Sequence, residues 1–527
     1  MSGRLAIDFG TSNTVLAVWS EEQQIGITHH IPEYGQLYPQ GDRKVSLIPS
    51  LIHYDSNQRR WLGNQVLQRN LEKSDRTFRW IKRYISRRSP VKRRIDNRQI
   101  PYTEAGQDFL STVLLFAANE LGIQDEEIAF TVPVESFEHY EAWLGEVAQK
   151  AGIRRFRLID EPSAAALGYG AHIQPGDVYL IFDFGGGTLD VAVVLIETEE
   201  ESKSGRRCRV LGKAGTELGG TNLDQLLFLE VLKQSGYSDS DETIRRLSGA
   251  LLVECEQAKI RLSSRDRTKI SVLDPNTGAV IGADISRSRF EELMDENNVF
   301  TELDQTIRKS LNYARDKGYQ EENIKSVLLV GGSSQIPSIQ RTIRQIFGKD
   351  RVLLDRPLDA VARGAAAFIS GIDFYDHIQH DYAIRFFNRQ SQKYDYKTLV
   401  PRGTSYPASG IANLTIKASH DGQEHLGMAL FEVSEVRRSS SLRELIFDPS
   451  GGARMIDVSP EEEERRTYFW LNEDSPTFLQ TQLPTKSGDR CFRVEFSIDE
   501  NKRLLITSRD LKSMKITHKD YPVVKLT

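Results

Sequence analysis

The first 370 or so residues alternate short apolar runs, which are typical of β-strands, with amphipathic stretches of helical period. The strand-like runs fall at residues 5–8, 15–19, 128–132, 178–183, 191–196 and 327–330. The helix-like stretches cover residues 107–121, 138–151, 223–233, 247–262 and 302–316. Because strands that alternate with helices are typical of sheets covered by helices, this pattern predicts an α/β architecture.

After Gly371 the helical period fades, and short strand-like runs are separated by turn residues. These runs fall at residues 414–418, 428–433, 444–447, 467–471, 491–498 and 504–508. Such spacing predicts a β-sandwich or barrel. The charged segment 459–466 is expected to be a solvated loop. We therefore expect a first domain over residues 1–372, a linker over 373–388 and a β-sandwich over 389–527.

Composition narrows the class of protein. A length of 527 residues predicts two or more domains, and 69 basic against 74 acidic residues give a net charge of -5, which argues against a dedicated nucleic-acid binder. The three cysteines are far apart, so a disulfide scaffold and a cysteine-based zinc site are not expected. No signal peptide or long apolar run is recognisable, and a cytoplasmic protein without membrane contact is expected.

Two segments of the first domain echo each other. Each is an apolar strand that ends in aspartate, a glycine-rich turn and a second apolar strand: Leu5-Ala-Ile-Asp-Phe-Gly-Thr-Ser-Asn-Thr and Leu180-Ile-Phe-Asp-Phe-Gly-Gly-Gly-Thr-Leu-Asp. Glycine-rich turns bring backbone N–H groups close to a phosphate. Carboxylates at Asp8, Asp183 and Asp190 would repel phosphate unless a divalent cation and its waters lie between them. The pair predicts two related subdomains that offer matched phosphate-binding hairpins to one cleft.

Two further segments have open interpretations. Glu161 follows a strand and Pro162 begins a helix, so Glu161 is either a surface acid that matches the helix dipole or part of the shell of a metal-bound water. Gly331, Gly332 and Ser333 follow a buried strand. They form either an ordinary strand–helix turn or a bare backbone surface for a nucleoside.

Together these elements resemble the DnaK-type heat-shock chaperones, the seventy-kilodalton class, within the actin and sugar-kinase ATPase superfamily. The resemblance rests on the two hairpins and on four further stretches: Thr131-Val-Pro, Ile159-Asp-Glu-Pro-Ser-Ala-Ala-Ala, Glu217-Leu-Gly-Gly and Leu329-Val-Gly-Gly-Ser. It implies an actin-like, two-lobed ATPase domain of duplicated ribonuclease H-like subdomains, followed by a β-sandwich that binds peptides.

The resemblance also implies roles for individual residues. Asp8 and Asp183 would hold magnesium through waters, and Glu161, Asp190 and Thr188 would support the attacking water, with potassium as a further candidate ion. The nucleotide, ATP or ADP, would be held by Gly10, Thr11, Ser12, Asn13, Gly185, Gly186, Gly187, Thr188, Gly219, Gly220, Glu256, Lys259, Ser263, Gly331, Gly332 and Ser333. The alternative for Glu256 and Lys259 is a surface ion pair.

The chain departs from the family pattern at three nucleotide contacts. A family lysine that contacts the phosphates is replaced by Leu67, and we expect the lost charge to slow hydrolysis unless Lys82 or Arg69 compensates. Two family arginines that clamp the adenine are replaced by Ile260 and Gln335. The helical lid and the leucine-rich interdomain linker of the family are not recognisable.

The function expected from this resemblance is that of a slow ATP-dependent chaperone that binds unfolded or extended peptide segments. A J-domain co-chaperone and a nucleotide-exchange factor are the implied partners. The alternative is a nucleotide-binding scaffold with little or no hydrolysis. Base selectivity, clients, interdomain coupling and oligomeric state stay open.

Overall fold

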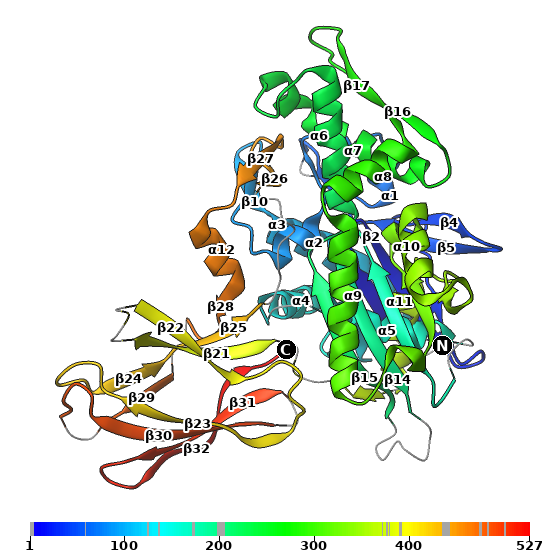
Figure 1. Ribbon diagram of the computed structural model, residues 1–527. Coiled ribbons are helices and arrows are strands. Elements are labelled where there is room, and N and C mark those ends of the chain that lie inside the picture. Colours follow the sequence, from blue (N-terminus) through cyan, green and yellow to red (C-terminus); the bar gives the residue numbers. More distant parts are fainter. Residues whose placement is uncertain are drawn as a thin grey trace. The chain divides into compact units, whose positions relative to one another are not determined.

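The computed structural model describes residues 5–527 apart from 58, 124–125, 135–137, 171–173, 198–205, 372, 376–377, 379, 389–390, 392, 435–442, 474–476, 482–483 and 500–501. The described chain forms two compact units (Figure 1). Unit 1 comprises Met1–Val134, Tyr140–Tyr375 and Arg437–Val458. Unit 2 comprises Glu135–His139, Asp376–Val436 and Ser459–Thr527.

The first half of unit 1, lobe I, is built on one sheet in the strand order β12-β11-β1-β2-β5-β4, with β3 paired to β2. Its strands are β1 (Leu5–Phe9), β2 (Asn13–Ser20), β3 (Ile25–Thr28), β4 (Gln36–Gln40), β5 (Arg43–Pro49), β11 (Ile128–Val132) and β12 (Phe156–Asp160). Strand β1 runs parallel to β11 and antiparallel to β2. The ring of Phe9 packs on Phe109 of α3 (Tyr102–Leu121) and on Trp143 of α4 (Glu138–Lys150), so these helices bury one face of the sheet.

Smaller elements complete lobe I beside this sheet. They are β6 (Ile52–Tyr54), β7 (Arg60–Leu62), α1 (Asn64–Gln68), β8 (Thr77–Phe78), α2 (Ile81–Ser86), β9 (Lys92–Ile95) and β10 (Arg98–Pro101). The short helix α2 is buried along most of its length, although it contains Lys82 and Arg83. A buried helix with two cations needs internal acceptors for both charges, and these are Glu161 for Lys82 and the hydroxyl of Thr221 for Arg83.

The second half, lobe II, repeats the arrangement of lobe I with the order β19-β18-β13-β14-β15-β20. Its strands are β13 (Val178–Phe184), β14 (Leu189–Ile196), β15 (Arg206–Thr216), β18 (Ile324–Val330), β19 (Val352–Leu353) and β20 (Asp373–Tyr375). Strand β13 runs parallel to β18 and antiparallel to β14, as β1 does with β11 and β2. The strands expected from the sequence in both hairpins are therefore confirmed, and so is the α/β architecture.

Helices α5 (Glu161–Gly168) and α11 (Ala360–Ile369) form the layer between the two sheets. Helix α11 packs on β1, β2 and β3 of lobe I, and α5 packs on β13 and β14 of lobe II. The helices approach so closely that a Cβ at Gly364 would lie 1.6 Å from the carbonyl oxygen of Ala164, and one at Gly168 would lie 1.8 Å from that of Ala360. Only glycine fits at this crossing.

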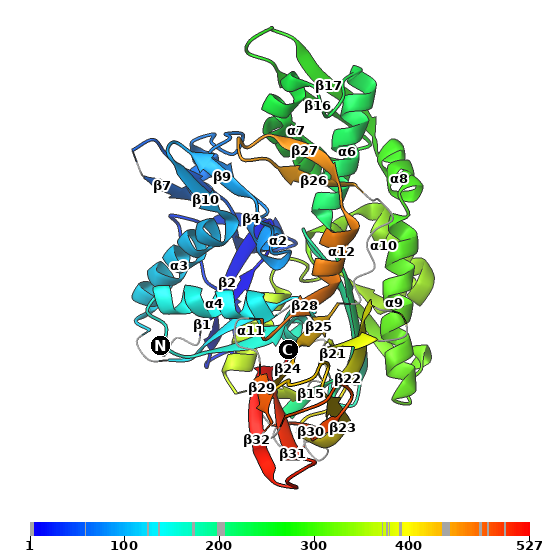
Figure 2. The same ribbon diagram turned by 90° about the vertical axis from the view of Figure 1, so that its left-hand side faces the viewer.

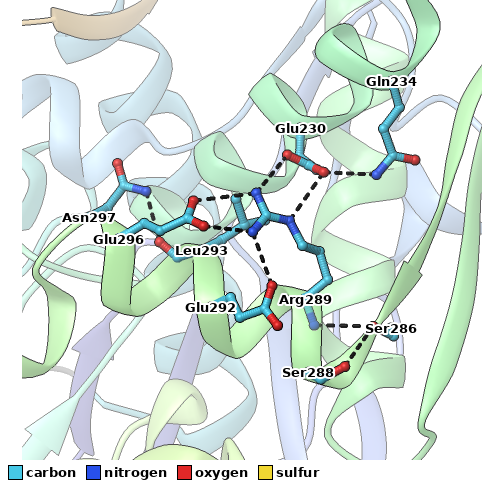
Figure 3. Close-up of polar contacts among 9 residues, drawn as sticks. All are labelled: Glu230, Gln234, Ser286, Ser288, Arg289, Glu292, Leu293, Glu296 and Asn297. Atoms are coloured by element: carbon cyan, nitrogen blue, oxygen red, sulfur yellow. Dashed lines mark hydrogen bonds and ion pairs between the residues drawn. The ribbon is translucent and has the colours of Figure 1, made fainter.

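The outer part of lobe II contains α6 (Gly220–Ser235), α7 (Glu242–Leu262), the hairpin of β16 (Arg267–Leu273) and β17 (Val280–Ser286), α8 (Arg287–Glu296), α9 (Val299–Asp316) and α10 (Pro337–Phe347). Ion pairs of Arg289 connect α8 with α6 and with the last turns of α8 itself (Figure 3). Its guanidinium bonds Glu230 of α6 at 3.2 Å and, within α8, Glu292 at 3.1 Å and Glu296 at 2.7 Å. The hydrogen bond from Arg289 holds the pKa of Glu230 below its usual value.

Unit 2 is a β-sandwich. One sheet has the order β22-β21-β25-β28 and the other β23-β30-β31-β32, and both contribute to one apolar core. The strands are β21 (Asp381–Asn388), β22 (Lys393–Val400), β23 (Ala408–Lys417), β25 (Leu430–Val433), β28 (Tyr468–Trp470), β30 (Arg490–Ile498), β31 (Arg503–Asp510) and β32 (Ile516–Lys525), with a further pair of β24 (His425–Met428) and β29 (Thr477–Gln480). No helix of the described residues is long and apolar enough to cross a membrane.

The C-terminal third differs from the sequence expectations in three places. The expected linker 373–388 holds β20, which pairs with β15 of unit 1, and β21, which belongs to unit 2. The segment 459–466, expected to be a loop, is instead the cap and most of the helix α12 (Pro460–Thr467). Ser459 caps this helix, and the charges of the helix match its dipole. The strand at 444–447 is present as β26 (Arg443–Phe447), but it belongs with β27 (Ala453–Asp457) to unit 1.

Candidate functional site

The turns of the two matched hairpins face each other. In each turn the first glycine donates its N–H to a carbonyl three residues on: Gly10 to Asn13 at 3.0 Å and Gly185 to Thr188 at 2.9 Å. A Cβ at Gly187 would lie 2.4 Å from the hydroxyl of Thr11. The glycines of the second turn are therefore needed because the first turn approaches them closely.

Acidic side chains gather behind these turns. Asp8 at the end of β1 accepts a hydrogen bond from the hydroxyl of Thr131 at 2.9 Å, and Asp183 occupies the matching place in β13. Asp190 of β14 is opposite Asp183 and accepts the N–H of Val134 at 3.1 Å. Burial, and then the charge of Glu161, raise the pKa of Asp8 to about 6 and that of Asp190 to about 8, and they also raise the pKa of Asp183.

One buried cation offsets these acids. The ammonium group of Lys82, from α2, forms an ion pair with Glu161 at the start of α5, and both side chains are less than a tenth exposed. Burial opposes the charge of Lys82, but the negative charges of Glu161 and Asp8 outweigh it and raise the pKa of this lysine. Lys82 is therefore protonated at neutral pH within the acidic cluster.

Lobe II supplies the opposite wall from α7 and from the turn after β18. Lys259 donates to the carbonyl of Gly220 and pairs with Asp224, both at 2.9 Å. Ser333 donates its hydroxyl to the carbonyl of Gly185 at 2.9 Å. Gly331 has φ +81°, and a Cβ there would lie 2.3 Å from the carbonyl oxygen of Phe184, so the turn packs directly on β13. The ion pair considered for Lys259 exists, but its partner is Asp224 and it is buried.

These elements enclose a cavity of about 430 Å³, a size suited to a small-molecule ligand. Its lining contains most of the residues expected at a nucleotide site: Asp8, Gly10, Thr11, Ser12, Asn13, Glu161, Asp183, Gly185, Gly186, Gly187, Thr188, Glu256, Lys259, Ser263, Gly331, Gly332 and Ser333. Sequence reasoning did not anticipate the apolar part of the lining from lobe I, which includes Tyr38, Pro39 and Leu47.

Three expected residues support the cavity from behind. Asp190 is fully buried in β14. Gly220 donates its N–H to the carbonyl of Gly185 at 3.0 Å. A Cβ at Gly219 would lie 2.4 Å from the backbone of Gly187. Both glycines thus pack under the second turn and fix its position.

The three positions that depart from the family pattern separate into two groups. Ile260 and Gln335 line the cavity, so the places of the two adenine arginines do face the ligand space. Leu67 lies in α1 and is not among the lining residues. Of the two cations considered as substitutes for the missing lysine, Arg69 is exposed and stacks on Trp61 at 3.7 Å, whereas Lys82 lines the cavity.

The acids fit a magnesium ion that is held through its water shell. Asp8 and Asp183 supply hard oxygen donors beside the phosphate-type turns, and their pKa values are raised by burial and then by the negative charge of Glu161, which a cation would offset. Among the described residues, no three histidine, cysteine, aspartate or glutamate side chains are arranged to bind a metal directly. The donor set therefore suits an ion whose ligands are mainly water and phosphate.

The fold and the site together define an α/β protein with duplicated, aspartate-led hairpins around one cavity. A family model described as Hsp70 protein matches residues 117–374. The chain is also similar to "Chaperone protein DnaK" of Deinococcus proteolyticus, with 29% identity over 400 residues that cover 69% of this chain. The aligned part spans 59% of the length of that relative. Both similarities, to the Hsp70 family model and to a DnaK chaperone, agree with the resemblance drawn from the motifs.

Proposed function

We propose that this protein is an ATP-dependent molecular chaperone of the DnaK type, which binds ATP and magnesium between lobes I and II of an actin-like ATPase domain. The observation that carries the proposal is the opposition of the two hairpin turns across one cavity. The hydroxyls of Thr11, Ser12 and Thr188 and the glycine N–H groups converge there beside Asp8 and Asp183.

Each group has a defined task in hydrolysis of the γ-phosphate. The N–H groups of Gly10 and Gly185 close the turns themselves, so the backbone N–H groups of Gly186 and Gly187 bind phosphate oxygens, and the hydroxyls orient them. Magnesium, when bound, neutralises charge on the phosphates. Glu161, Asp190 and Thr188 support the attacking water. Lys82 supplies the positive charge that the family places at the position of Leu67, so that loss of the family lysine leaves the site with a cation.

The β-sandwich of unit 2 is proposed to bind unfolded or extended peptide segments. The support for this is the similarity to a DnaK chaperone together with the sandwich fold. A J-domain co-chaperone and an exchange factor stay predictions from the same similarity.

Calorimetric titration with ATP and magnesium, followed by single-turnover hydrolysis of the same complex, tests the ATPase assignment. Asp183→Asn should abolish magnesium-dependent turnover. The control is Asp266→Asn, which changes an exposed aspartate that pairs with Arg287 in lobe II, away from the cavity.

The three outcomes separate the candidate functions. Binding with turnover that Asp183→Asn abolishes supports a working ATPase cycle. Binding without turnover over hours favours the nucleotide-binding scaffold. Absence of binding by the folded wild-type protein contradicts both.

A further inference from the structure

The hairpin formed by β26 and β27, residues 443–457, occupies a place that its position in the sequence does not predict. The strands that precede and follow it, β25 and β28, pair with each other in the sandwich of unit 2. The hairpin itself belongs to unit 1, where it lies beside α7 and the β9–β10 region (Figure 2). We call residues 443–457 the clasp.

On one side the clasp is bound to lobe I. The N–H of Phe447 donates to the hydroxyl of Tyr84 at 2.8 Å, and its ring packs on Trp80 with centroids 5.4 Å apart. The N–H of Arg94 donates to the carbonyl of Pro449 at 2.8 Å. Leu445 and Phe447 are both buried, so this contact has an apolar core as well as hydrogen bonds.

On its other side the clasp is bound to lobe II. The N–H of Ala453 donates to the hydroxyl of Ser248 at 2.5 Å, and Asp448 pairs with Arg245 at 3.2 Å. The N–H of Met455 donates to Asp239 at 3.3 Å. The clasp therefore has separate, specific contacts to each lobe.

The tip of the clasp fits between the lobes without spare room. A Cβ at Gly451, which has φ +90°, would lie 2.5 Å from the guanidinium of Arg93 in lobe I. A Cβ at Gly452 would lie 2.5 Å from the carbonyl oxygen of Arg245 in lobe II. Two consecutive glycines thus face opposite lobes at contact distance, so a side chain at either position would push one lobe away.

The elements that the clasp joins are the ones that form the walls of the cavity. Helix α2 contacts the clasp through Tyr84 and supplies Lys82 to the cavity. Helix α7 contacts the clasp near its start, at Arg245 and Ser248, and supplies Glu256 and Lys259 to the cavity two to four turns later. When the lobes separate to release a ligand, the clasp must lose its contacts with one of them.

We propose that the clasp is an intramolecular brake on nucleotide exchange: it holds lobes I and II closed around the ligand and so limits the rate at which ADP leaves. The identity of the ligand rests on the function proposed above. The lobes also contact each other directly, through Lys73 with Glu254 at 2.7 Å and Arg83 with Thr221 at 2.6 Å. The clasp therefore adds to an existing closed arrangement.

The test is the dissociation rate of a fluorescent ADP analogue, followed by stopped flow after an excess of unlabelled ATP is added to the full chain. Gly451→Ala should raise the rate about tenfold, since the loss of one or two net hydrogen bonds corresponds to such a factor. Its matched control is Gly403→Ala in unit 2, because Gly403 has φ +80° and nothing within 4 Å of an added Cβ. Both changes place a Cβ on a backbone of positive φ, but only the Cβ of Gly451→Ala contacts lobe I.

A second pair of variants tests the contact with lobe II. Arg245→Ala removes the ion pair with Asp448, and Arg503→Ala removes a comparable ion pair with Asp499, at 2.7 Å, inside unit 2. Only Arg245→Ala should accelerate dissociation. If Gly451→Ala and Arg245→Ala both release the ADP analogue within twofold of the wild-type rate, with binding intact, the proposed brake is wrong. The proposed ATPase activity would be unaffected by that result.

A readout without nucleotide keeps the two proposals distinguishable. Spin labels at the exposed residues Gln99 of lobe I and Ser271 of lobe II report the distance between the lobes in the ligand-free protein. Gly451→Ala should broaden the distribution of this distance toward longer values, and Gly403→Ala should not. If the wild-type protein binds no ADP, the proposed function is wrong. If Gly451→Ala leaves the distance distribution unchanged, the proposal that the clasp holds the lobes closed is wrong, whatever the protein binds.

Discussion

Replacement of Lys82 by methionine removes the cation that pairs with Glu161 beside Asp8, and it keeps the length of the side chain. Lys82 and Glu161 form a buried ion pair next to Asp8 and Asp183. Loss of one positioned charge that stabilises a transition state costs about 3–4 kcal/mol, which corresponds to hydrolysis slower by about 10²–10³-fold. We therefore expect Lys82→Met to bind ATP but to turn it over at this reduced rate.

Stability has to be separated from catalysis in this variant. Breaking a buried ion pair costs about 3–5 kcal/mol when the remaining charge stays ionised. The double variant Lys82→Met/Glu161→Gln removes both charges, and we expect it to recover most of the free energy of unfolding but none of the turnover. Lys82→Arg keeps the charge and should retain part of the activity.

The assay is single-turnover hydrolysis with saturating ATP and magnesium, alongside urea unfolding of each variant. Arg69→Met is the matched control, because Arg69 is a nearby cation that stacks on Trp61 outside the cavity. Turnover of a folded Lys82→Met protein within about threefold of the wild-type rate would refute the role given to Lys82.

Three further results are expected. Gln335→Arg should bind ATP about 2- to 30-fold more tightly in calorimetric titration, because stacking of a guanidinium on an aromatic ring contributes about 0.5–2 kcal/mol; equal affinity would contradict the alignment of this position with an adenine contact. Burial, and then the charge of Glu161, raise the pKa of Asp190 from 3.8 to about 8, so the folded protein keeps a proton that the unfolded chain releases near pH 4. The ligand-free protein should therefore lose stability as the pH rises from about 4 to 8, and Asp190→Asn should reduce this slope in denaturation measured at pH 5 and pH 8; an unchanged slope would refute the argument. Gly364→Ala, whose Cβ would lie 1.6 Å from a carbonyl oxygen, should cost about 3 kcal/mol of unfolding free energy, whereas Gly145→Ala, with only ordinary contacts, should cost nothing.

The sequence was most informative where local pattern and chemistry coincide. The two hairpins were predicted because an apolar strand, an aspartate and a glycine-rich turn occur twice, and β1–β2 and β13–β14 form as expected. The spacing of Glu256, Lys259 and Ser263 placed them on one helical face, and all three line the cavity. The resemblance to the DnaK-type chaperones was drawn from the same motifs, and the similarities to an Hsp70 model and to a DnaK chaperone agree with it.

The place of β26 and the choice of the substitute cation could not be predicted, because both depend on contacts between distant parts of the chain. Apolar alternation predicted the strand β26, but it carries no information about which partner covers the strand, and the clasp binds unit 1. Likewise, the sequence could name Lys82 and Arg69 as substitutes for the missing lysine but could not choose between them. The choice follows from α2, whose burial directs Lys82 into the cavity.

A missed local signal explains one further error. Segment 459–466 was taken for a loop because of its charge. Ser459 followed by Pro460, three glutamates in the first turn and two arginines in the last turn are nevertheless the capping pattern of a helix, and α12 forms there.

The place of the clasp along the chain has a consequence for the order in which the protein forms during synthesis. The lobes of unit 1 are complete once Tyr375 has been made, but the clasp ends only at residue 457, some 80 residues later. At about 5–20 residues per second, this leaves an interval of roughly 4–16 s. During this interval the clasp does not yet contact the two lobes, and Trp80 and Tyr84 lack their contacts with Phe447. The proposed brake therefore predicts that nucleotide exchange in the nascent lobes is unrestrained until the clasp has left the ribosome together with the first strands of the sandwich.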